Sequence, residues 1–396
     1  MANTPVSFTN RDDLWERMRN GDARDWDLII VGGGICGAGI LREAVRKGYR
    51  ALLIEQRDFA WGTSSRSSQM VHGGLRYLGM GETKLTRHSL TERERLLREA
   101  PGLVERAGWY FTVRKRQFPG RMSVSILMWV YDRIAGIKDH RYLQGDELRT
   151  RFEGLSEEIK GAGYYTDSLT DDARLVLRVL TEAIRVGGNA LNYVRATRLL
   201  VDSGELSGVT VENALNGDSV DLRAPVVINA TGAWADRLRN QVNPEKRVRP
   251  LRGSHLVIPA RRLTVTGVLS LLHPQDKRPV YAFPWQGATV LGTTDLDHPH
   301  ERDVEASISN EEVEYLLQAA AAMFPQLRLS RADVISSWAG VRPVIGTERS
   351  KDPSKERRDQ AVWSDHGLIS VSGGKLTTFR LIALVALEAA RPRLPE

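Results

Sequence analysis

The chain has 396 residues, of which 41% are hydrophobic, and its 56 Lys and Arg against 49 Asp and Glu give a formal net charge of +7. A chain of this length is too long for a single ordinary hydrophobic core, so we expect a soluble globular protein with two domains. Its positive charge favours anionic substrates or an anionic membrane surface. One cysteine excludes an intrachain disulfide, a cysteine-ligated iron–sulfur cluster and a C-x-x-C pair, and fits a cytoplasmic location.

Several other classes of protein are also excluded. The N-terminus lacks a basic region followed by an apolar one, and no apolar run approaches the ~18 residues that a transmembrane helix needs. Zinc-finger spacing and an arginine-rich tail are missing, so we expect no nucleic-acid partner. The eight histidines form no H-x-x-x-H pair, so we expect no metal site.

After a short polar helix expected near residues 11–18, the chain begins a strand–turn–helix–strand unit. Residues 27–31 form a continuous apolar run, typical of a parallel strand covered on both faces. Residues 32–37 fit G-x-G-x-x-G, in which the glycines allow a tight bend, a close approach of backbone to a pyrophosphate, and a helix lying close to the strand.

A helix over 38–47 and a buried strand over 51–54 complete this unit. Glu55 ends the second strand, where an acid roughly twenty residues after the glycines accepts hydrogen bonds from an adenosine ribose. The pattern therefore predicts a dinucleotide-binding turn, although a glycine-rich turn without a ligand would have the same sequence.

The next segment predicts a loop laid along a cofactor. Residues 59–68 are rich in Ser, Thr and Gly, and residues 72–78 mix glycines with His, Arg and Tyr. A surface linker is the alternative. An amphipathic helix is then expected over 83–98.

Residues 114–138 allow two interpretations. A basic run at 114–116 precedes an apolar segment at 122–137 that contains Trp129 and Tyr131. This segment suits a helix resting on a membrane surface, but a helix packed on the domain core explains the same residues, and we favour the core.

Later elements should return to the same cofactor. A helix opens at 171–175, strands follow at 190–197, 205–212 and 225–230, and the last of these ends at Gly232. Ligands lie at the carboxyl ends of strands in open α/β sheets, so Gly232 should face the cofactor together with Gly34.

A second domain is expected from about residue 241 to 339, with short strands at 254–258, 280–284 and 289–293 and a helix at 311–322. A last strand at 367–372 leads to a glycine turn at 373–374, which opens the final helix and presents free N–H groups to negative charge. Because the predicted contacts are scattered along the chain, and no second G-x-G-x-x-G exists to bind NAD separately, FAD is the expected cofactor.

Several motifs in order resemble the FAD-dependent glycerol-3-phosphate dehydrogenases, within the D-amino-acid-oxidase-like flavoprotein group. They lie at 63–65, 72–77, 171–175, 229–232, 252–255, 292–295, 340–343 and 373–377. The resemblance implies an α/β fold, in which a Rossmann-like FAD-binding domain with a mixed central sheet is interleaved with an α+β substrate (cap) domain. The expected FAD-binding segments are 1–80, 165–240 and 340–396, and the expected cap segments are 81–164 and 241–339.

The resemblance also implies a reaction. Glycerol 3-phosphate would lose a hydride from C2 to flavin N5, giving dihydroxyacetone phosphate, and a membrane quinone would accept the electrons, which places the protein in the cytoplasm or peripherally on the cytoplasmic face of the membrane. A related flavin oxidase or dehydrogenase acting on another small anion, a hydroxy acid or an amino acid, is the alternative.

Roles for individual residues come from matching motif positions. Arginine suits a phosphate dianion because its guanidinium is forked and permanently charged, so Arg76, Arg342 and Arg358 (or Arg357) are the expected phosphate ligands. His255 is the expected base, with Tyr77 orienting the hydroxyl, and Lys375 adds positive charge beside the flavin.

Each of these assignments has a structural alternative. The arginines would then be ion-pair partners of acids in the sheet, His255 a backbone hydrogen-bonding partner, and Lys375 a cap. The expected FAD contacts are Gly32, Gly34, Ile35, Cys36, Gly37, Glu55, Ser64, Ser68, Gly74, Leu75, Ala196, Gly232, Gly374, Leu376 and Thr377.

The sequence departs from this family in two ways. Gln69 stands where the family usually has lysine, and family members commonly continue into a helical C-terminal domain, whereas this sequence ends at Glu396. The electron acceptor, the oligomeric state and lipid contact at 114–138 stay open at this point.

Overall fold

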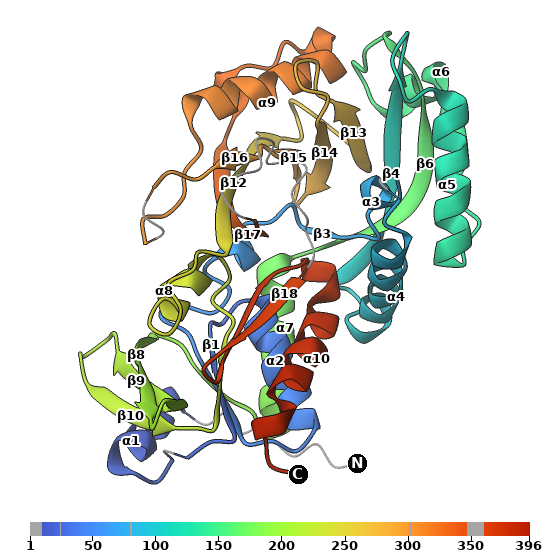
Figure 1. The fold of residues 1–396 in the computed structure, drawn as a ribbon. Coiled ribbons are helices and arrows are strands. Elements are labelled where there is room, and N and C mark those ends of the chain that lie inside the picture. The colour runs from blue at the N-terminus through green and yellow to red at the C-terminus, as the bar shows by residue number, and fades with distance from the viewer. Residues whose placement is uncertain (1–9, 24, 80, 301–302, 347–359) are drawn as a thin grey trace. The chain divides into compact units, whose positions relative to one another are not determined.

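The computed structural model describes residues 10–23, 25–79, 81–300, 303–346 and 360–396, without the side chains of Arg76 and Gln360. The chain divides into two compact units (Figure 1). Unit 1 comprises residues 1–65, 172–251 and 341–396, and unit 2 comprises residues 66–171 and 252–340.

The two units alternate along the chain in the same order as the expected domains. Residues 66–80 and 165–171 cluster with unit 2, because a strand at Met70–Val71 pairs with a strand at Ile159–Thr170. The assignment of FAD to the first unit and of substrate to the second stays a prediction.

Unit 1 is built on a six-stranded sheet whose order is β18-β19-β11-β1-β2-β7. Its strands are β1 (Leu28–Val31), β2 (Ala51–Ile54), β7 (Asn189–Leu191), β11 (Val226–Asn229), β18 (Gln360–Asp365) and β19 (Leu368–Gly373). All neighbours are parallel except β18 and β19, so the expected mixed sheet is confirmed. The central strands are buried throughout, as their unbroken apolar runs predict.

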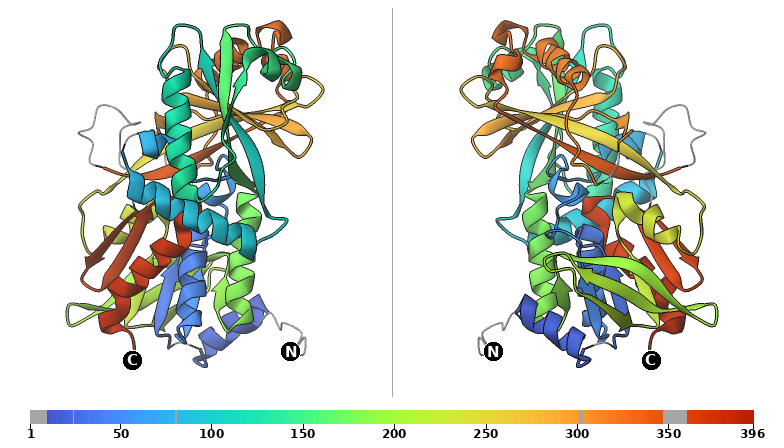
Figure 2. Two further views of the ribbon diagram at one scale, coloured as in Figure 1. Left: turned by 90° about the vertical axis from the view of Figure 1, so that its right-hand side faces the viewer. Right: turned by 90° about the vertical axis from the view of Figure 1, so that its left-hand side faces the viewer.

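The two faces of this sheet are covered differently. Helices α2 (Ile35–Arg46), α7 (Asp172–Arg185) and α10 (Phe379–Ala390) lie side by side on one face (Figures 1 and 2). A three-stranded antiparallel sheet of β8 (Val194–Asp202), β9 (Glu205–Asn213) and β10 (Ser219–Arg223) shares a hydrophobic core with Ile29 and Leu52. The single strand expected at 190–197 is therefore two strands, β7 and β8, which belong to different sheets.

The remaining helices of unit 1 are short. Helix α1 (Arg11–Asn20) begins where the Asn10 side chain accepts a hydrogen bond from the Asp12 N–H, and it buries Leu14, Trp15 and Met18. Helix α8 (Ala235–Arg239) follows β11.

Unit 2 contains most of a larger sheet with the order β16-β12-β15-β14-β13-β4-β6-β3, where β17 pairs with β12 and β5 pairs with β6. Its strands are β3 (Met70–Val71), β4 (Val104–Arg114), β5 (Arg141–Gln144), β6 (Ile159–Thr170), β12 (Val248–Pro259), β13 (Val268–Leu272), β14 (Pro279–Trp285), β15 (Ala288–Gly292), β16 (Leu296–Asp297) and β17 (Ser336–Ile345). The three strands predicted in the second domain are confirmed as β12, β14 and β15, whereas the long strands β4 and β6 were not predicted.

Two hydrophobic cores stabilise unit 2. One contains residues of β12, β15, α6 (Gly145–Arg151) and α9 (Asn310–Met323). The other contains residues of β4, α3 (Leu75–Gly79), α4 (Thr83–Glu99) and α5 (Arg121–Ala135). Helix α5 buries Val124, Met128 and Tyr131, so the core interpretation of this segment holds for one face of the helix.

Gly37 gives a direct test of how closely α2 lies against the sheet. A Cβ atom at this position would overlap the Gly32 carbonyl, which is backbone and cannot rotate away. Alanine favours a helix over glycine by up to about 1 kcal/mol, but overpacking costs about 1–3 kcal/mol. We expect Gly37→Ala to lower the free energy of unfolding, measured by urea denaturation. Gly120→Ala, which meets nothing within 4 Å, is the control; equal midpoints for the two variants would contradict this account.

Candidate active site

The carboxyl ends of the parallel strands in unit 1 gather the predicted cofactor residues. Strands β1, β2, β11 and β19 run in the same direction, so their carboxyl ends lie at one edge of the sheet. The predicted residues that follow these strand ends are Gly32 and Gly34 after β1, Glu55 after β2, Gly232 after β11 and Gly374 after β19. Segments far apart in the sequence thus place their turns together, as predicted.

The turn after β1 forms a cradle that only glycine permits. Gly32 has a φ of 114°, and a Cβ there would lie 2.6 Å from the Ala230 carbonyl oxygen. The Ile35 N–H donates to the Ser64 hydroxyl at 3.0 Å. No described residue accepts a hydrogen bond from the N–H groups of Cys36 or Gly37, so the first turn of α2 presents them to an anion.

Glu55 ties the end of β2 to the same turn. Its carboxylate accepts hydrogen bonds from the Gly33 N–H at 2.7 Å and from the Arg57 N–H at 2.9 Å. Burial raises the pKa of Glu55 against the opposing effect of these hydrogen bonds. Because a carboxylate offers about four lone pairs, Glu55 can accept hydroxyl donors as well.

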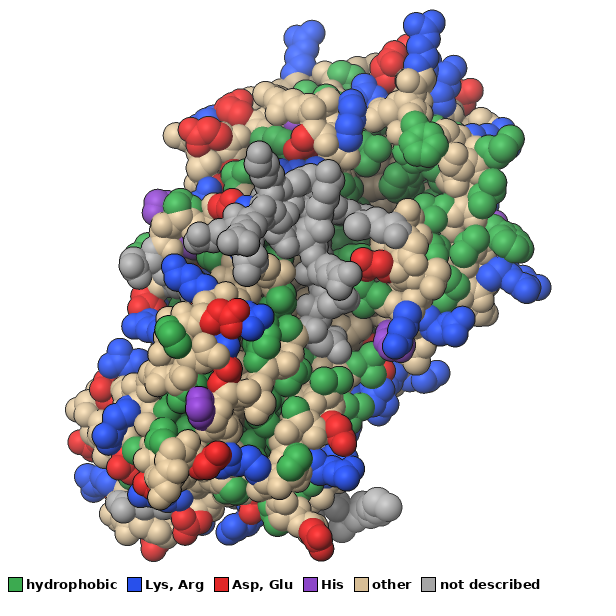
Figure 3. Space-filling view, in the orientation of Figure 1, with side chains coloured by type: hydrophobic (Ala, Val, Ile, Leu, Met, Phe, Trp, Pro, Cys, Tyr) green, Lys and Arg blue, Asp and Glu red, His purple; other side chains and the backbone are tan. Residues whose placement is uncertain are grey.

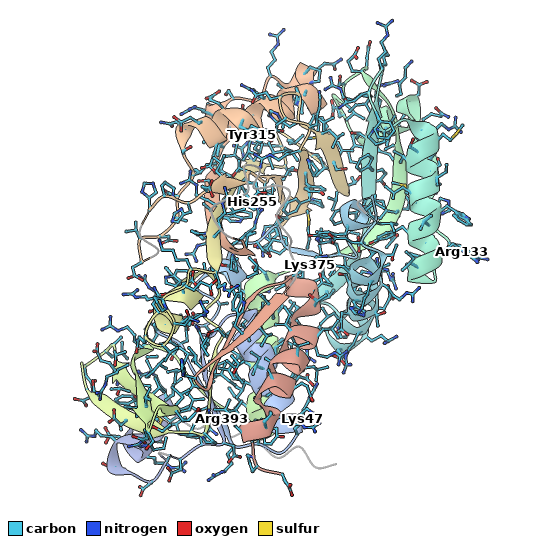
Figure 4. All side chains as sticks on the ribbon, in the orientation of Figure 1. Lys47, Arg133, His255, Tyr315, Lys375 and Arg393 are labelled. Carbon is cyan, nitrogen blue, oxygen red and sulfur yellow. The ribbon has the colours of Figure 1, made fainter. Side chains whose placement is uncertain are left out.

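Hydrogen bonds also join the ends of β11 and β19. The Ser372 hydroxyl donates to the Gly232 carbonyl at 3.1 Å, and the Asn229 side-chain amide donates to the Ser370 hydroxyl at 3.3 Å. A Cβ at Gly232, which has a φ of 58°, would meet open space. Lys375 precedes the short helix η6 (Leu376–Thr378) that leads into α10, and Figure 4 shows it at that helix opening.

Cys36 and Ala196 complete the predicted residues of unit 1 that concern the cofactor. Cys36 is partly exposed, and desolvation raises the pKa of its thiol to about 11, so the thiol is protonated at neutral pH and the turn acts through its backbone. Ala196 lies on β8, which belongs to the three-stranded sheet and not to the parallel one. It is partly buried against the hydrophobic core that the two sheets share. Its contact with a cofactor stays a prediction.

In unit 2, His255 is held rigidly on β12 (Figure 4). It is buried; its Nε2 lies 2.9 Å from the Ser68 hydroxyl, and its ring stacks on Trp338 with centroids 4.9 Å apart. A Cβ at Gly292, directly opposite on β15, would overlap the imidazole. Ser68, expected as a cofactor contact, therefore fixes a candidate base, and neither this pairing nor the role of Trp338 was predicted.

Of residues 72–78, predicted as a loop laid along a cofactor, only residues 72–74 form a loop. It includes Gly74, with a φ of 83°, and leads into α3, which contains Leu75, Arg76 and Tyr77. Leu75 packs in the hydrophobic core and Tyr77 is buried.

Three residues for which the sequence predicted no role surround this loop. The Gly73 N–H donates to the Asp167 carboxylate, which also accepts hydrogen bonds from Arg93 at 2.8 Å and from Tyr131 at 2.6 Å. A buried acid and a buried arginine are unusual enough to attract attention, but nothing in the sequence shows that they are buried.

Of the two other predicted phosphate ligands, one lies among the described residues and one does not. Arg342 lies on β17 and is partly exposed. Arg358 and the alternative Arg357 lie outside the described residues.

Comparison with known proteins agrees with these features. Residues 27–386 match a family described as FAD dependent oxidoreductase. A curated relative, the aerobic glycerol-3-phosphate dehydrogenase of Bacillus subtilis (strain 168), is 36% identical over 409 aligned positions that cover 100% of this chain and 72% of the relative.

Two solved structures are similar to this one. A glycerol-3-phosphate dehydrogenase from Bacillus halodurans, complexed with FAD, is 31% identical with a TM-score of 0.79, covering 96% of this chain and 67% of the other. A glycine oxidase from Bacillus cereus has a TM-score of 0.70, covering 94% and 98%, but at 18% identity it shows only a shared fold.

The residues of unit 1 fit FAD. The glycine cradle suits a pyrophosphate, as do the two N–H groups for which the described residues offer no acceptor, and Glu55 suits a ribose. The open space at Gly232 and the glycine turn before Lys375 lie at the same edge of the sheet.

Proposed function

Because the chain belongs to the family of FAD-dependent oxidoreductases, we propose that it oxidises sn-glycerol 3-phosphate to dihydroxyacetone phosphate. The main support is the 36% identity, over the whole chain, to a protein named as an aerobic glycerol-3-phosphate dehydrogenase. FAD supplies the two-electron acceptor for the hydride that leaves C2.

Arginines bind the substrate in this proposal. Arg342 and Arg76, with Arg358 as a third candidate, donate charge-assisted hydrogen bonds to the phosphate, for which their permanent charge and forked geometry are suited. Binding through the phosphate fixes the distance from this group to C2 and disfavours substrates that lack a phosphate at that distance.

His255 is the proposed base, and its neighbours orient the groups between which the proton moves. The imidazole takes the proton from the C2 hydroxyl oxygen as the hydride leaves, and Tyr77 orients that hydroxyl. The Ser68 hydrogen bond and the Trp338 stack keep the imidazole in one orientation. Lys375 stabilises the negative charge that the cofactor gains on reduction.

We also propose that the electrons pass to a quinone while the protein rests peripherally on a membrane. Among the described residues, no helix is both long and apolar enough to cross a bilayer. The outer face of α5 exposes Met122, Ile126 and Trp129, with exposed fractions of 78%, 58% and 56%, and Phe118, three residues before the helix begins, is 81% exposed. Spacings of four and three residues put Met122, Ile126 and Trp129 on one side of α5, and Figure 3 shows hydrophobic side chains along the edge that α5 occupies.

Cations flank this apolar stripe. A hollow of about 480 Å³ next to Phe118 is lined by Arg114, Lys115, Arg116 and Lys277, with Glu158 as its one carboxylate. At the other end of α5, the Arg133 guanidinium lies 5.9 Å from the centroid of the Trp129 ring and points outward (Figure 4). An apolar stripe between cationic ends suits the interface of an anionic bilayer.

The substrate is tested by anaerobic titration of the FAD-loaded protein with glycerol 3-phosphate, lactate and glycine. We expect only glycerol 3-phosphate to bleach the flavin absorbance quickly, since only it matches the proposed phosphate site. Fast bleaching by glycine or lactate alone would replace the substrate by an amino acid or a hydroxy acid. FAD that no compound reduces would contradict an enzymatic role.

Arg342→Ala tests the phosphate site. Loss of one bidentate charge-assisted contact should raise the KM for glycerol 3-phosphate by about tenfold or more while the bound FAD is unchanged. The matched control is Arg261→Ala, an exposed arginine of unit 2, which should leave KM as it is. An unchanged KM in Arg342→Ala would remove this residue from the phosphate site.

Vesicle sedimentation tests the membrane contact. Met122→Glu combined with Trp129→Glu should weaken binding to phosphatidylglycerol-containing vesicles by about tenfold or more, since two apolar anchors become charged. Leu215→Glu, at a position 63% exposed in unit 1, should not. Binding of the parent protein should also fall as salt rises; equal binding by all three proteins would exclude α5 as the contact.

A further inference from the structure

Asp167 is the centre of a buried polar network in unit 2. Its side chain on β6 is 1% exposed, and the Arg93 side chain that pairs with it is 0% exposed. Tyr131 donates its hydroxyl to the other carboxylate oxygen at 2.6 Å. Burial raises the pKa of Asp167, although the charge of Arg93 acts in the opposite direction. Burial would lower the pKa of Arg93, but the Asp167 carboxylate outweighs this effect, so the pKa of Arg93 is raised.

Among the described residues, this network reaches the loop at residues 72–74, which leads into α3, through the Gly73 backbone N–H. The Gly73 N–H points at the carboxylate of Asp167, at 3.1 Å from Oδ1 and 3.3 Å from Oδ2. A Cβ atom at Gly73 would overlap the Tyr131 hydroxyl and a methyl group of Leu90, so the loop lies as close to α4 and α5 as its backbone allows. Two residues after Gly73, α3 begins and carries Arg76 and Tyr77.

We propose that Asp167 is a positioning residue: its carboxylate, itself oriented by Arg93 and Tyr131, holds the Gly73 N–H and so fixes the loop that precedes α3, the helix of Arg76 and Tyr77. The inference rests on the roles proposed above for those two side chains. Asp167, Arg93 and Tyr131 lie on β6, α4 and α5, outside the loop itself.

Stability alone is a poor explanation for this arrangement. Well-packed apolar side chains usually stabilise a core as well as a buried ion pair does, because desolvation offsets the attraction between the charges. A carboxylate held by two donors from separate helices instead has a defined direction, and the third group that donates to it among the described residues is the Gly73 N–H of the loop. Such pre-organisation matters where a displacement of about 1 Å changes binding.

The test compares Tyr131→Phe with Tyr165→Phe. Tyr165 is a buried tyrosine of the same core, 5.4 Å from Tyr131 between ring centroids, and it makes no described hydrogen bond to Asp167. Both variants remove one hydroxyl from similar surroundings, so both should fold. Asp167→Asn removes the fully buried counter-charge of Arg93, which keeps Glu94 as a partner at 2.7 Å, and serves as the stronger second variant.

Hydrogen exchange gives a readout that needs neither cofactor nor substrate. We expect the peptide covering residues 70–79 to exchange about tenfold faster in Tyr131→Phe, and faster still in Asp167→Asn, but at the parent rate in Tyr165→Phe. Unchanged exchange in this peptide in both Tyr131→Phe and Asp167→Asn would overturn the proposal, even if the protein oxidises glycerol 3-phosphate.

Kinetics then separate positioning from general destabilisation. Tyr131→Phe should raise the KM for glycerol 3-phosphate by about three- to tenfold with bound FAD unchanged, while Tyr165→Phe should not. Equal increases in both variants would reduce Asp167 to a core ion pair. If glycerol 3-phosphate is not the substrate, the exchange result still decides whether Asp167 holds the loop, so the two failures are distinguishable.

Discussion

Unit 1 depends on the close contact between helix α2 and the segments around it. A side chain on Gly32 would strike the Ala230 carbonyl, and one on Gly37 would strike the carbonyl of Gly32. Gly39, on the same helix, leaves room for the Phe379 ring of α10. Two distant parts of the chain, at Ala230 and Phe379, therefore approach the turn before α2 and α2 itself at glycines where only hydrogen fits.

The sequence predicted this unit well because its signals are local. An unbroken apolar run, a glycine turn and a second apolar run fall within residues 27–55, and each has one structural explanation. The motif around Gly232 and the turn before Lys375 could be placed at the same edge from the direction of parallel strands alone. The resemblance to a known family supplied the roles of individual side chains, which spacing does not contain.

Unit 2 was harder to predict because its structure depends on long-range pairing. Strand β4 begins with Val104, Glu105 and Arg106, of which only the first is buried, so its start does not read as an apolar strand. The hydrogen bond between Ser68 and His255 joins residues that are 187 positions apart in the sequence. The hydrogen bond between Arg93 and Asp167 joins residues that are 74 positions apart. No local pattern distinguishes such partners from solvated polar residues.

The alternation of the two units along the chain has a consequence for synthesis on the ribosome. Strand β11 gains its second parallel neighbour only when β19, at Leu368–Gly373, becomes available, and unit 2 needs residues up to 340. Most of the polypeptide must therefore leave the exit tunnel before the hydrophobic interior of either unit is complete. Until then, the unpaired edge of β11 is open to pairing with other chains. A nascent chain of this kind has greater need of chaperones than one whose domains are consecutive.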